Sequence, residues 1–183
     1  MPVKSPRNAL VVMGVAGVGK TTTAQLLAEQ LGWMRAEADE FHPQTNIDKM
    51  ASGTPLTDAD RMPWLESIRD WISEQAAAGD DVVLTCSALK RSYRDVLRQA
   101  NARVRFVFLH GPAPLIAERM QQRSGHFMPT SLLDSQFGDL EPLHPDEDGV
   151  TVDLRDTTHQ IVTTALTALN LTNPDLPQLG AQP

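Results

Sequence analysis

A segment near the N-terminus has the residue types and spacing of a phosphate-binding loop. Residues 14–21 satisfy the pattern GxxxxGK[ST] at every required position. The glycines let backbone N–H groups turn toward phosphate oxygens, and a helix that begins near Lys20 presents the positive end of its dipole. We expect Lys20 to reach the β- and γ-phosphates of a nucleotide, and the Thr21 hydroxyl to ligate Mg²⁺. The predicted nucleotide-binding residues are Gly14, Val15, Ala16, Gly17, Val18, Gly19, Lys20, Thr21 and Thr22.

This loop predicts nucleotide binding without identifying the reaction, because GTPases, ATPases, motor domains and small-molecule kinases all contain it. The chain is too short to hold a partner domain beside this one, and it has no internal repeat. These features favour a kinase that phosphorylates a metabolite.

Two carboxylates stand at the end of the next apolar segment, residues 33–38. Glu37 lies within this segment, and Asp39 directly follows it. Side chains separated by one residue point the same way on an extended strand. The carboxyl end of a strand next to the phosphate loop is where an acceptor would meet the γ-phosphate. One carboxylate of the pair could therefore bind in the coordination shell of Mg²⁺, and the other could bind the acceptor hydroxyl. Taken alone, such a pair is more often a solvated turn.

The segments that must position these residues alternate between strand and helix patterns. Short apolar runs predict strands, and apolar residues at helical spacing predict helices. We expect residues 39–63 to form a loop with a short helix, and Pro63 to begin the helix that ends at Gly79. The pattern predicts a single α/β domain over residues 1–171, with a parallel sheet of about five strands flanked by helices, and a flexible tail over 172–183. The predicted strands are 9–13, 33–38, 82–86, 104–109 and 150–154, and the other predicted helices are 21–31, 92–100, 112–122 and 157–169.

Composition narrows the class of protein further. With 183 residues and 41% hydrophobic side chains, the chain can bury roughly 70% of its unfolded surface in one core. A net charge of −7 argues against nucleic acid as a partner. The apolar run over residues 9–18 is too short to span a bilayer, so we expect no membrane association. The single cysteine, Cys86, excludes an internal disulfide and indicates a reducing compartment, which predicts a cytoplasmic protein.

Longer strings of residues identify a specific resemblance. The sequence closely resembles the gluconate kinase (gluconokinase) family of P-loop small-molecule kinases, in order from about Leu10 to Leu169. The strings are Asp39-Glu40-Phe41-His42-Pro43, Asn46-Ile47-Asp48-Lys49-Met50, the run from Gly53 to Leu65, Cys86-Ser87-Ala88-Leu89-Lys90 with Tyr93-Arg94, His126-Phe127-Met128, and Leu132-Leu133-Asp134-Ser135-Gln136-Phe137 with Leu140-Glu141.

The resemblance implies ATP-dependent phosphorylation of D-gluconate to 6-phosphogluconate, with ATP and Mg²⁺ bound. It also implies a fold like that of the nucleoside-monophosphate kinases, with a lid over about residues 123–137. Asp39 matches the acidic residue that accepts or orients the proton of the acceptor hydroxyl. Glu37 stands where Asp is also common in the family, so its longer side chain must reach the metal shell.

Gluconate carries a carboxylate and a row of hydroxyls, so its site needs cationic donors at one end and neutral or acidic partners along the chain. His42 could contact the substrate or fix the turn before Pro43. The substrate-binding candidates are Asp39, His42, Lys49, Arg61, His126 and Gln136.

Arg119 and Arg123 lie four residues apart on one face of the helix that enters the expected lid. Such arginines can grip ATP and stabilise the charge of the transferring phosphoryl group, which makes Arg123 a catalytic candidate beside Lys20 and Asp39. The strand over residues 82–86 ends without a Walker-B aspartate. Metal coordination must therefore rest on Thr21, phosphate oxygens, water and the carboxylates of Glu37 and Asp39.

Two other functions remain open at this point. One is a kinase for shikimate or another small hydroxy acid, and the other is a non-catalytic nucleotide-binding regulator. Apolar helix faces permit a homodimer without requiring one. We expect Lys20, Lys49, Arg61, Arg119 and Arg123 to converge on a locally positive cleft of this acidic protein.

Overall fold

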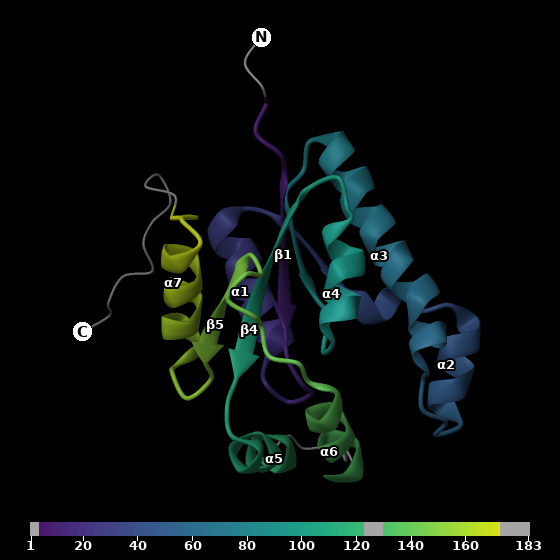
Figure 1. Cartoon of the computed structure of the whole chain (residues 1–183). Coiled ribbons are helices and arrows are strands. Elements are labelled where there is room, and N and C mark those ends of the chain that lie inside the picture. The colour runs from purple at the N-terminus through teal and green to yellow at the C-terminus, as the bar shows by residue number, and fades with distance from the viewer. Residues whose placement is uncertain (1–3, 123–129, 173–183) are drawn as a thin grey trace.

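Short apolar runs form the strands of a central parallel sheet (Figure 1). The computed structural model describes residues 4–122 and 130–172. The sheet has five strands in the order β2-β3-β1-β4-β5, and every neighbouring pair is parallel. This confirms the predicted α/β class and strand number. The strands are β1 (Asn8–Met13), β2 (Met34–Glu37), β3 (Val82–Thr85), β4 (Arg103–His110) and β5 (Gly149–Asp153).

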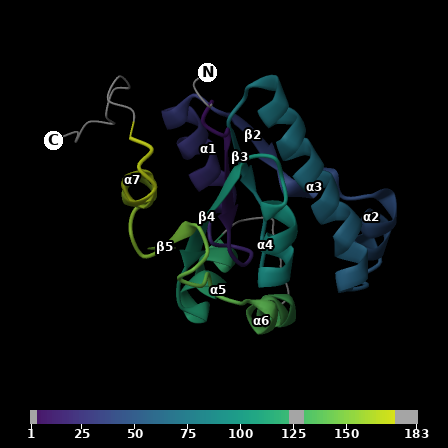
Figure 2. The same cartoon turned by 45° about the horizontal axis from the view of Figure 1, so that its top comes forward.

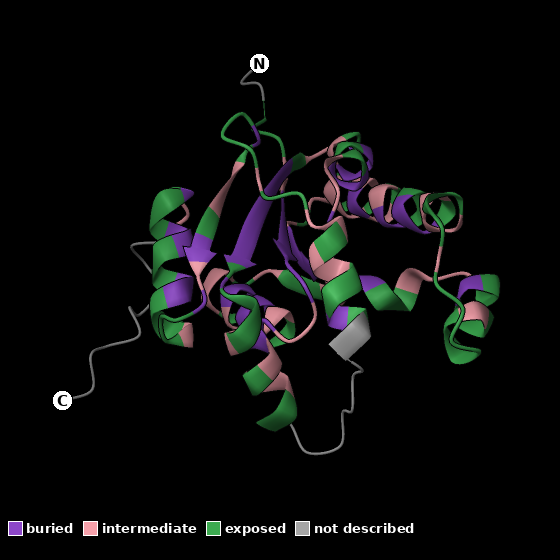
Figure 3. Cartoon of the chain, turned by 60° about the horizontal axis from the view of Figure 1, so that its bottom comes forward, coloured by how far each residue is buried: buried purple, intermediate pink, exposed green. Residues whose placement is uncertain are grey.

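Helices cover both faces of this sheet, and β1 contributes alternate residues to the two cores. Leu10 and Val12 belong to the core on the side of α1 and α7, whereas Ala9 and Val11 belong to the core beneath α3 and α4. Figure 3 shows the buried strands enclosed between the helical layers. The covering helices are α1 (Lys20–Leu31), α3 (Asp58–Ala78), α4 (Arg91–Arg98) and α7 (Thr158–Ala168).

The carboxyl ends of the strands face a different group of elements. Helices α5 (Ala113–Gln122) and α6 (Thr130–Asp139) lie beyond the arrowheads of β4 and β1 in Figure 1. The short helix η1 (Ala38–Phe41) continues β2, and α2 (Gln44–Ala51) lies outside α3, away from the sheet (Figures 1 and 2).

The expected lid and tail fall partly outside the described residues. Of the expected lid over 123–137, residues 123–129 are not described, and the rest begins α6, a helix that the sequence pattern did not predict. The expected tail over 172–183 is described only at Thr172. Both boundaries stay predictions. No helix in the described parts of the chain is long and apolar enough to cross a membrane.

The start of α3 corrects the sequence prediction for Pro63. The helix begins at Asp58, so that Pro63 lies inside it. A capping box sets this start, since Thr57 Oγ1 accepts from the Asp60 N–H at 3.1 Å and Asp60 Oδ2 accepts from the Thr57 N–H at 2.9 Å. Proline costs the helix one internal hydrogen bond. The cap and the burial of Trp64 and Ile68 offset this cost.

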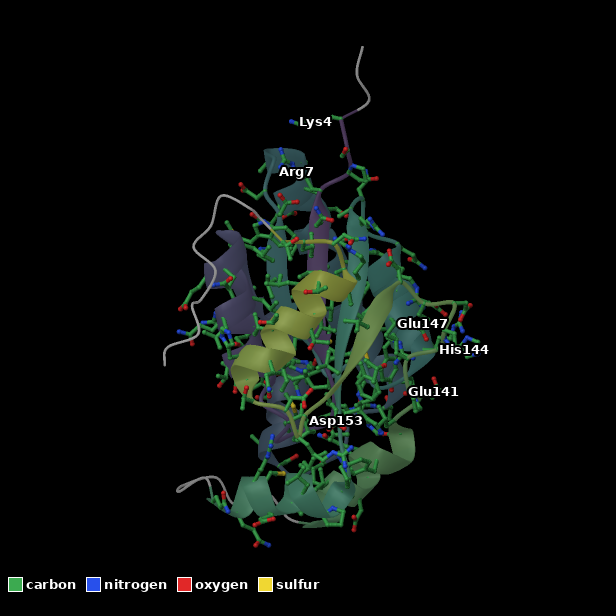
Figure 4. All side chains as sticks on the ribbon, turned by 90° about the vertical axis from the view of Figure 1, so that its left-hand side faces the viewer. Lys4, Arg7, Glu141, His144, Glu147 and Asp153 are labelled. Carbon is green, nitrogen blue, oxygen red and sulfur yellow. The ribbon has the colours of Figure 1, made fainter. Side chains whose placement is uncertain are left out.

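A buried ion network joins α4 to the segment between α6 and β5. The side chains of Arg94 and Glu147 are both buried and form two hydrogen bonds of 2.7 and 2.9 Å. Arg98 adds a third at 2.9 Å. Figure 4 labels Glu147 with Glu141 and His144 along this segment. Burial alone would raise the pKa of Glu147, but the hydrogen bonds from Arg94 and Arg98 outweigh it and lower the pKa to about 2.

Glu147→Gln should lower the free energy of unfolding by about 3 kcal/mol at pH 7, because it leaves the buried Arg94 without its counter-charge. The folded-state pKa of Glu147 lies below its ordinary value of 4.5, so its charge stabilises the fold above that value and this contribution is lost as the pH falls toward about 2. The difference in the free energy of unfolding between wild type and Glu147→Gln, measured by urea titration, should therefore decrease below pH 4.5. Glu74→Gln, on the exposed face of α3, is the control and should change stability little. A similar loss in both variants would contradict this account.

Candidate active site

The phosphate loop connects β1 to α1 in a conformation that requires glycine. Gly14 has φ of +143°, and a Cβ there would lie 2.8 Å from the carbonyl oxygen of Leu109. Gly17 has φ of +84°, and its Cβ would lie 2.4 Å from Met120 Cγ. The N–H of Gly14 donates to the carbonyl of Ser87 at 3.2 Å, which fixes the loop against the segment after β3. The helix α1 begins at Lys20, so its first N–H groups face the loop without helical partners.

Two side chains lie against this loop. Lys20 Nζ donates to the carbonyl oxygens of Gly14 and Val15 at 3.0 and 3.1 Å. Gln136 Oε1, from α6, accepts the N–H of Ala16 at 2.7 Å. The structure thus brings Gln136, a substrate-binding candidate from sequence, to the phosphate loop itself. An amide oxygen bound there competes with a phosphate oxygen for the same N–H.

Glu37 lies beside the hydroxyl of Thr21, the other residue predicted to hold the metal. Its Oε2 accepts from the hydroxyl of Thr21 at 3.4 Å and also from the hydroxyl of Thr85, which ends β3. Arg35 Nη1 lies 2.5 Å from Oε1. Thr85 therefore occupies the Walker-B end of β3 and orients a carboxylate supplied by β2. The predicted metal pair of Thr21 and Glu37 is brought together.

The donors here suit Mg²⁺, which prefers hard oxygen ligands and keeps several waters. Within residues 4–122 and 130–172, no group of three or more His, Cys, Asp or Glu side chains could hold a metal ion. A magnesium ion at Thr21 and Glu37 would therefore take its remaining ligands from phosphate oxygens and water.

Asp39 and His42 lie at the two ends of η1. Trp64 holds this turn, since its Nε1–H donates to the carbonyl of Ala38 at 2.7 Å. The Asp39 carboxylate is exposed and makes no hydrogen bond to any other described residue. The His42 ring stacks on Trp64 at 4.3 Å between centroids. Burial lowers the pKa of His42, Asp39 acts in the opposite sense, and Arg61 lowers it further.

A cationic cluster lies where α3 and α4 begin. Arg61 Nη1 donates to the Tyr93 hydroxyl at 3.3 Å, and Lys90 Nζ donates to Asp58 Oδ1 at 3.2 Å. Tyr93 also donates to Asp58, and these hydrogen bonds from Tyr93 and Lys90 lower the pKa of Asp58. Lys90 was not among the sequence candidates, although it ends the matched string 86–90.

Lys49 lies apart from this cluster. Its Nζ donates to both carboxylate oxygens of Asp60 at 2.9 and 2.8 Å, and this bond is the main reason that the pKa of Asp60 falls to about 2. The structure ties Lys49 to the start of α3 through this pair.

A cavity of about 530 Å³ opens on the other side of the phosphate loop. Arg119 lines it and makes no hydrogen bond or ion pair with another described residue. Residues 156–158, which connect β5 to α7, form the opposite wall of this cavity and were not predicted from the sequence. Only their polarity could have indicated them, because their closeness to the loop comes from tertiary packing. The lining residues are Gly17, Val18, Gly19, Thr22, Thr23, Arg119, Gln122, Asp156, Thr157, Thr158 and Ile161.

Three further residues considered in the sequence are Arg123, His126 and Cys86. Arg123 and His126 lie outside the described residues, so their roles stay predictions. Cys86 is buried, and burial raises the pKa of its thiol to about 12. It is a packing residue at the end of β3.

Comparisons with known proteins show the family to which the chain belongs. A family model described as an AAA domain matches residues 10–143. A gluconokinase from Gluconobacter oxydans (strain 621H) is 53% identical over 143 residues, which cover 78% of this chain and 80% of that protein. The crystal structure of a sugar kinase from Janibacter sp. HTCC2649 has a TM-score of 0.85 and 52% identity, covering 91% of this chain and 96% of that one. A gluconokinase structure from Sinorhizobium meliloti 1021 has a TM-score of 0.79 and 46% identity, covering 91% and 94%.

Gln136→Glu should weaken ATP binding by about tenfold or more, because it sets a carboxylate beside the N–H of Ala16, where phosphate oxygens must approach. Isothermal titration calorimetry with a non-hydrolysable ATP analogue measures the change. Ser135→Glu adds the same charge at an exposed position of α6 and should change the Kd little. Equal effects of the two substitutions would show that net charge, and not the contact with Ala16, is responsible.

Proposed function

This chain belongs to the gluconokinase family, and from that premise we propose that it transfers the γ-phosphoryl group of ATP to D-gluconate, giving 6-phosphogluconate and ADP. One observation carries the proposal within the structure. The exposed carboxylate of Asp39 stands two residues beyond Glu37, which contacts Thr21 of the phosphate loop. A phosphate-binding loop, a metal-side carboxylate and an acceptor-side carboxylate therefore follow one another along one edge of the sheet.

The nucleotide takes its place from two features of the site. Its phosphates lie on the N–H groups of the loop and of the first turn of α1. Its base and ribose enter the cavity of about 530 Å³, between Arg119 and residues 156–158. Arg119 has no partner among the described residues and is therefore available to contact the nucleotide.

Thr21 and Glu37 would hold Mg²⁺ beside these phosphates. When bound, Mg²⁺ supplies positive charge that neutralises the β- and γ-phosphate oxygens. Thr85 and Arg35 keep the Glu37 carboxylate directed toward Thr21. Lys20, at the start of α1, adds the charge that stabilises the transferring group.

Asp39 serves the acceptor. The C6 hydroxyl oxygen of gluconate bonds to the γ-phosphorus as the bond from that phosphorus to the β,γ-bridging oxygen breaks. The electron pair of the broken bond leaves with ADP, and the hydroxyl proton passes to Asp39. The exposed carboxylate suits this role, because no described residue competes for its oxygens.

The rest of gluconate lies along η1 and the starts of α3 and α4. Arg61 and Lys90, which both lie over the Tyr93 ring, offer cationic donors for the substrate carboxylate. His42 lies close enough to Asp39 and Arg61 for their charges to act on its ring. Lys49 would act through Asp60, its partner. Arg123 and His126 would complete the site from the segment after α5. The cytoplasmic location and the homodimer stay predictions from the sequence.

The test of the proposed function is a coupled ADP-release assay on purified protein with Mg²⁺, ATP and a panel of hydroxy acids. Gluconate should stimulate ADP release, and shikimate should not. ADP release with shikimate alone would favour the other kinase, and no stimulation by any acid would favour a non-catalytic regulator.

Asp39→Asn should lower kcat by about 10² to 10⁴, because it removes the acceptor of the hydroxyl proton. The Kd of an ATP analogue should stay within about twofold, since the phosphate loop is untouched. The neighbouring Glu40→Gln, equally exposed on η1, is the matched control and should retain kcat. Loss of nucleotide affinity with unchanged turnover would argue against this role of Asp39.

Arg119→Ala should raise the KM for ATP by about tenfold and leave the KM for gluconate unchanged, because Arg119 lines the cavity assigned to the nucleotide. Steady-state kinetics with each substrate varied in turn separates the two constants. A raised KM for gluconate would mean that this cavity belongs to the acceptor.

A further inference from the structure

Asn46 is a buried polar residue that none of the roles above uses. It lies on α2 and is only 2% exposed. Its Nδ2 lies 2.9 Å from the carbonyl oxygen of Asp60 and 3.3 Å from Nδ1 of His42. Burial of an amide is costly unless its hydrogen bonds are made, so this placement has a structural cause.

The contact with Asp60 settles which way the amide faces. A carbonyl oxygen only accepts hydrogen bonds, so the atom next to it must be the nitrogen of the Asn46 amide. That nitrogen carries two hydrogens. One bonds to Asp60, and the other faces Nδ1 of His42. Nδ1 must then be the acceptor, and in the neutral ring the proton resides on Nε2.

The surroundings of His42 keep the ring in this state. Its plane stacks on Trp64 with an angle of 13° between the rings, which restricts rotation. The charged groups that act on the ring are Asp39 and Arg61, and they oppose each other, while burial lowers the pKa of His42. Protonation at Nδ1 would also set two donors face to face. Nε2 makes no hydrogen bond to any residue in 4–122 or 130–172.

We propose that Asn46 is a positioning residue that holds His42 as the neutral Nε2–H tautomer, so that His42 meets the acceptor substrate as a hydrogen-bond donor and not as a base. The ligand group is a hydroxyl or carboxylate oxygen of a polyhydroxy acid. This inference rests on the proposed function for the identity of the substrate, but its structural part does not. In this proposal Asp39 accepts the proton of the acceptor hydroxyl, and His42, which follows η1, donates a hydrogen bond to the substrate.

A hydrogen-bond donor at His42 should let the site discriminate between acids. A buried or oriented donor left without its oxygen partner costs more than a lost apolar contact. An analogue of gluconate that lacks the hydroxyl facing His42 should therefore bind poorly, while the reaction at Asp39 stays unaffected.

The direct test is the ¹⁵N NMR spectrum of the His42 ring in the full-length protein at neutral pH, without substrate. The expected spectrum has a protonated Nε2 and an unprotonated Nδ1. In Asn46→Asp, the new carboxylate accepts from Nδ1–H, so the spectrum should shift to the Nδ1-protonated or doubly protonated ring. A wild-type ring protonated on Nδ1, or an unchanged spectrum in Asn46→Asp, would overturn the inference.

Kinetics on His42 itself supply a second test that does not depend on the folding of Asn46→Asp. His42→Gln keeps an N–H donor and removes the base, so it should raise the KM for gluconate less than His42→Ala does. His42→Ala should raise that KM by about tenfold at similar kcat. A large loss of kcat in His42→Gln would mean that His42 acts as a base and would refute the proposal.

Asn46→Asp should raise the KM for gluconate by about tenfold with little change in the KM for ATP. Gln44→Ala, at an exposed position on α2, is the matched control and should alter neither constant. The outcomes separate the two hypotheses. A protein with the Nε2–H tautomer that does not phosphorylate gluconate would refute the proposed function alone. An active gluconokinase with Nδ1–H would refute the inference alone.

Discussion

The carboxylate of Glu37, held between the hydroxyls of Thr21 and Thr85, is the contact on which the arrangement of this site depends. Thr21 follows β1 through the phosphate loop, Glu37 ends β2 and Thr85 ends β3. Because parallel strands end at one edge of the sheet, this single carboxylate joins the nucleotide side to the acceptor side. In the proposed function, Asp39 serves the acceptor from this position, two residues beyond Glu37.

The segment after β3 contacts the phosphate loop and helps to fix its position. Ser87 accepts the N–H of Gly14, and the buried Arg94 donates to the carbonyls of Ala88 and Leu89. Ala88 has a positive φ of 45°, a conformation that costs a non-glycine residue energy. The ion pair between Arg94 and Glu147 thus maintains a strained turn directly beneath the phosphate loop, which gives a distant buried charge a part in the geometry of the site.

Much of this could be predicted from the sequence, because local patterns determine it. Apolar runs predicted the strands, the glycine spacing predicted the loop, and the carboxylates at the end of the second predicted strand placed Glu37 near Thr21. The remainder depends on contacts between distant segments. Pro63 wrongly suggested a helix start, because the capping box at Thr57 sets the start of α3 five residues earlier. The contact of Gln136 with Ala16, the cavity wall at residues 156–158 and the amide of Asn46 have no local signal, since packing alone brings these residues together.

The positions of the cationic residues bear on how an acidic protein can bind anionic substrates. The chain carries a net charge of −7, yet some of its cations lie near the proposed site. Lys20 lies at the loop, Arg119 at the cavity, and Arg61 and Lys90 at the starts of α3 and α4, whereas Lys49 is paired with Asp60. The central claim is that these groups transfer phosphate from ATP to gluconate. The most direct measurement is ³¹P NMR of the purified protein with Mg²⁺, ATP and gluconate. The account predicts ADP and a phosphomonoester on C6 of gluconate in equal amounts. ADP with inorganic phosphate, or unchanged ATP, would contradict it.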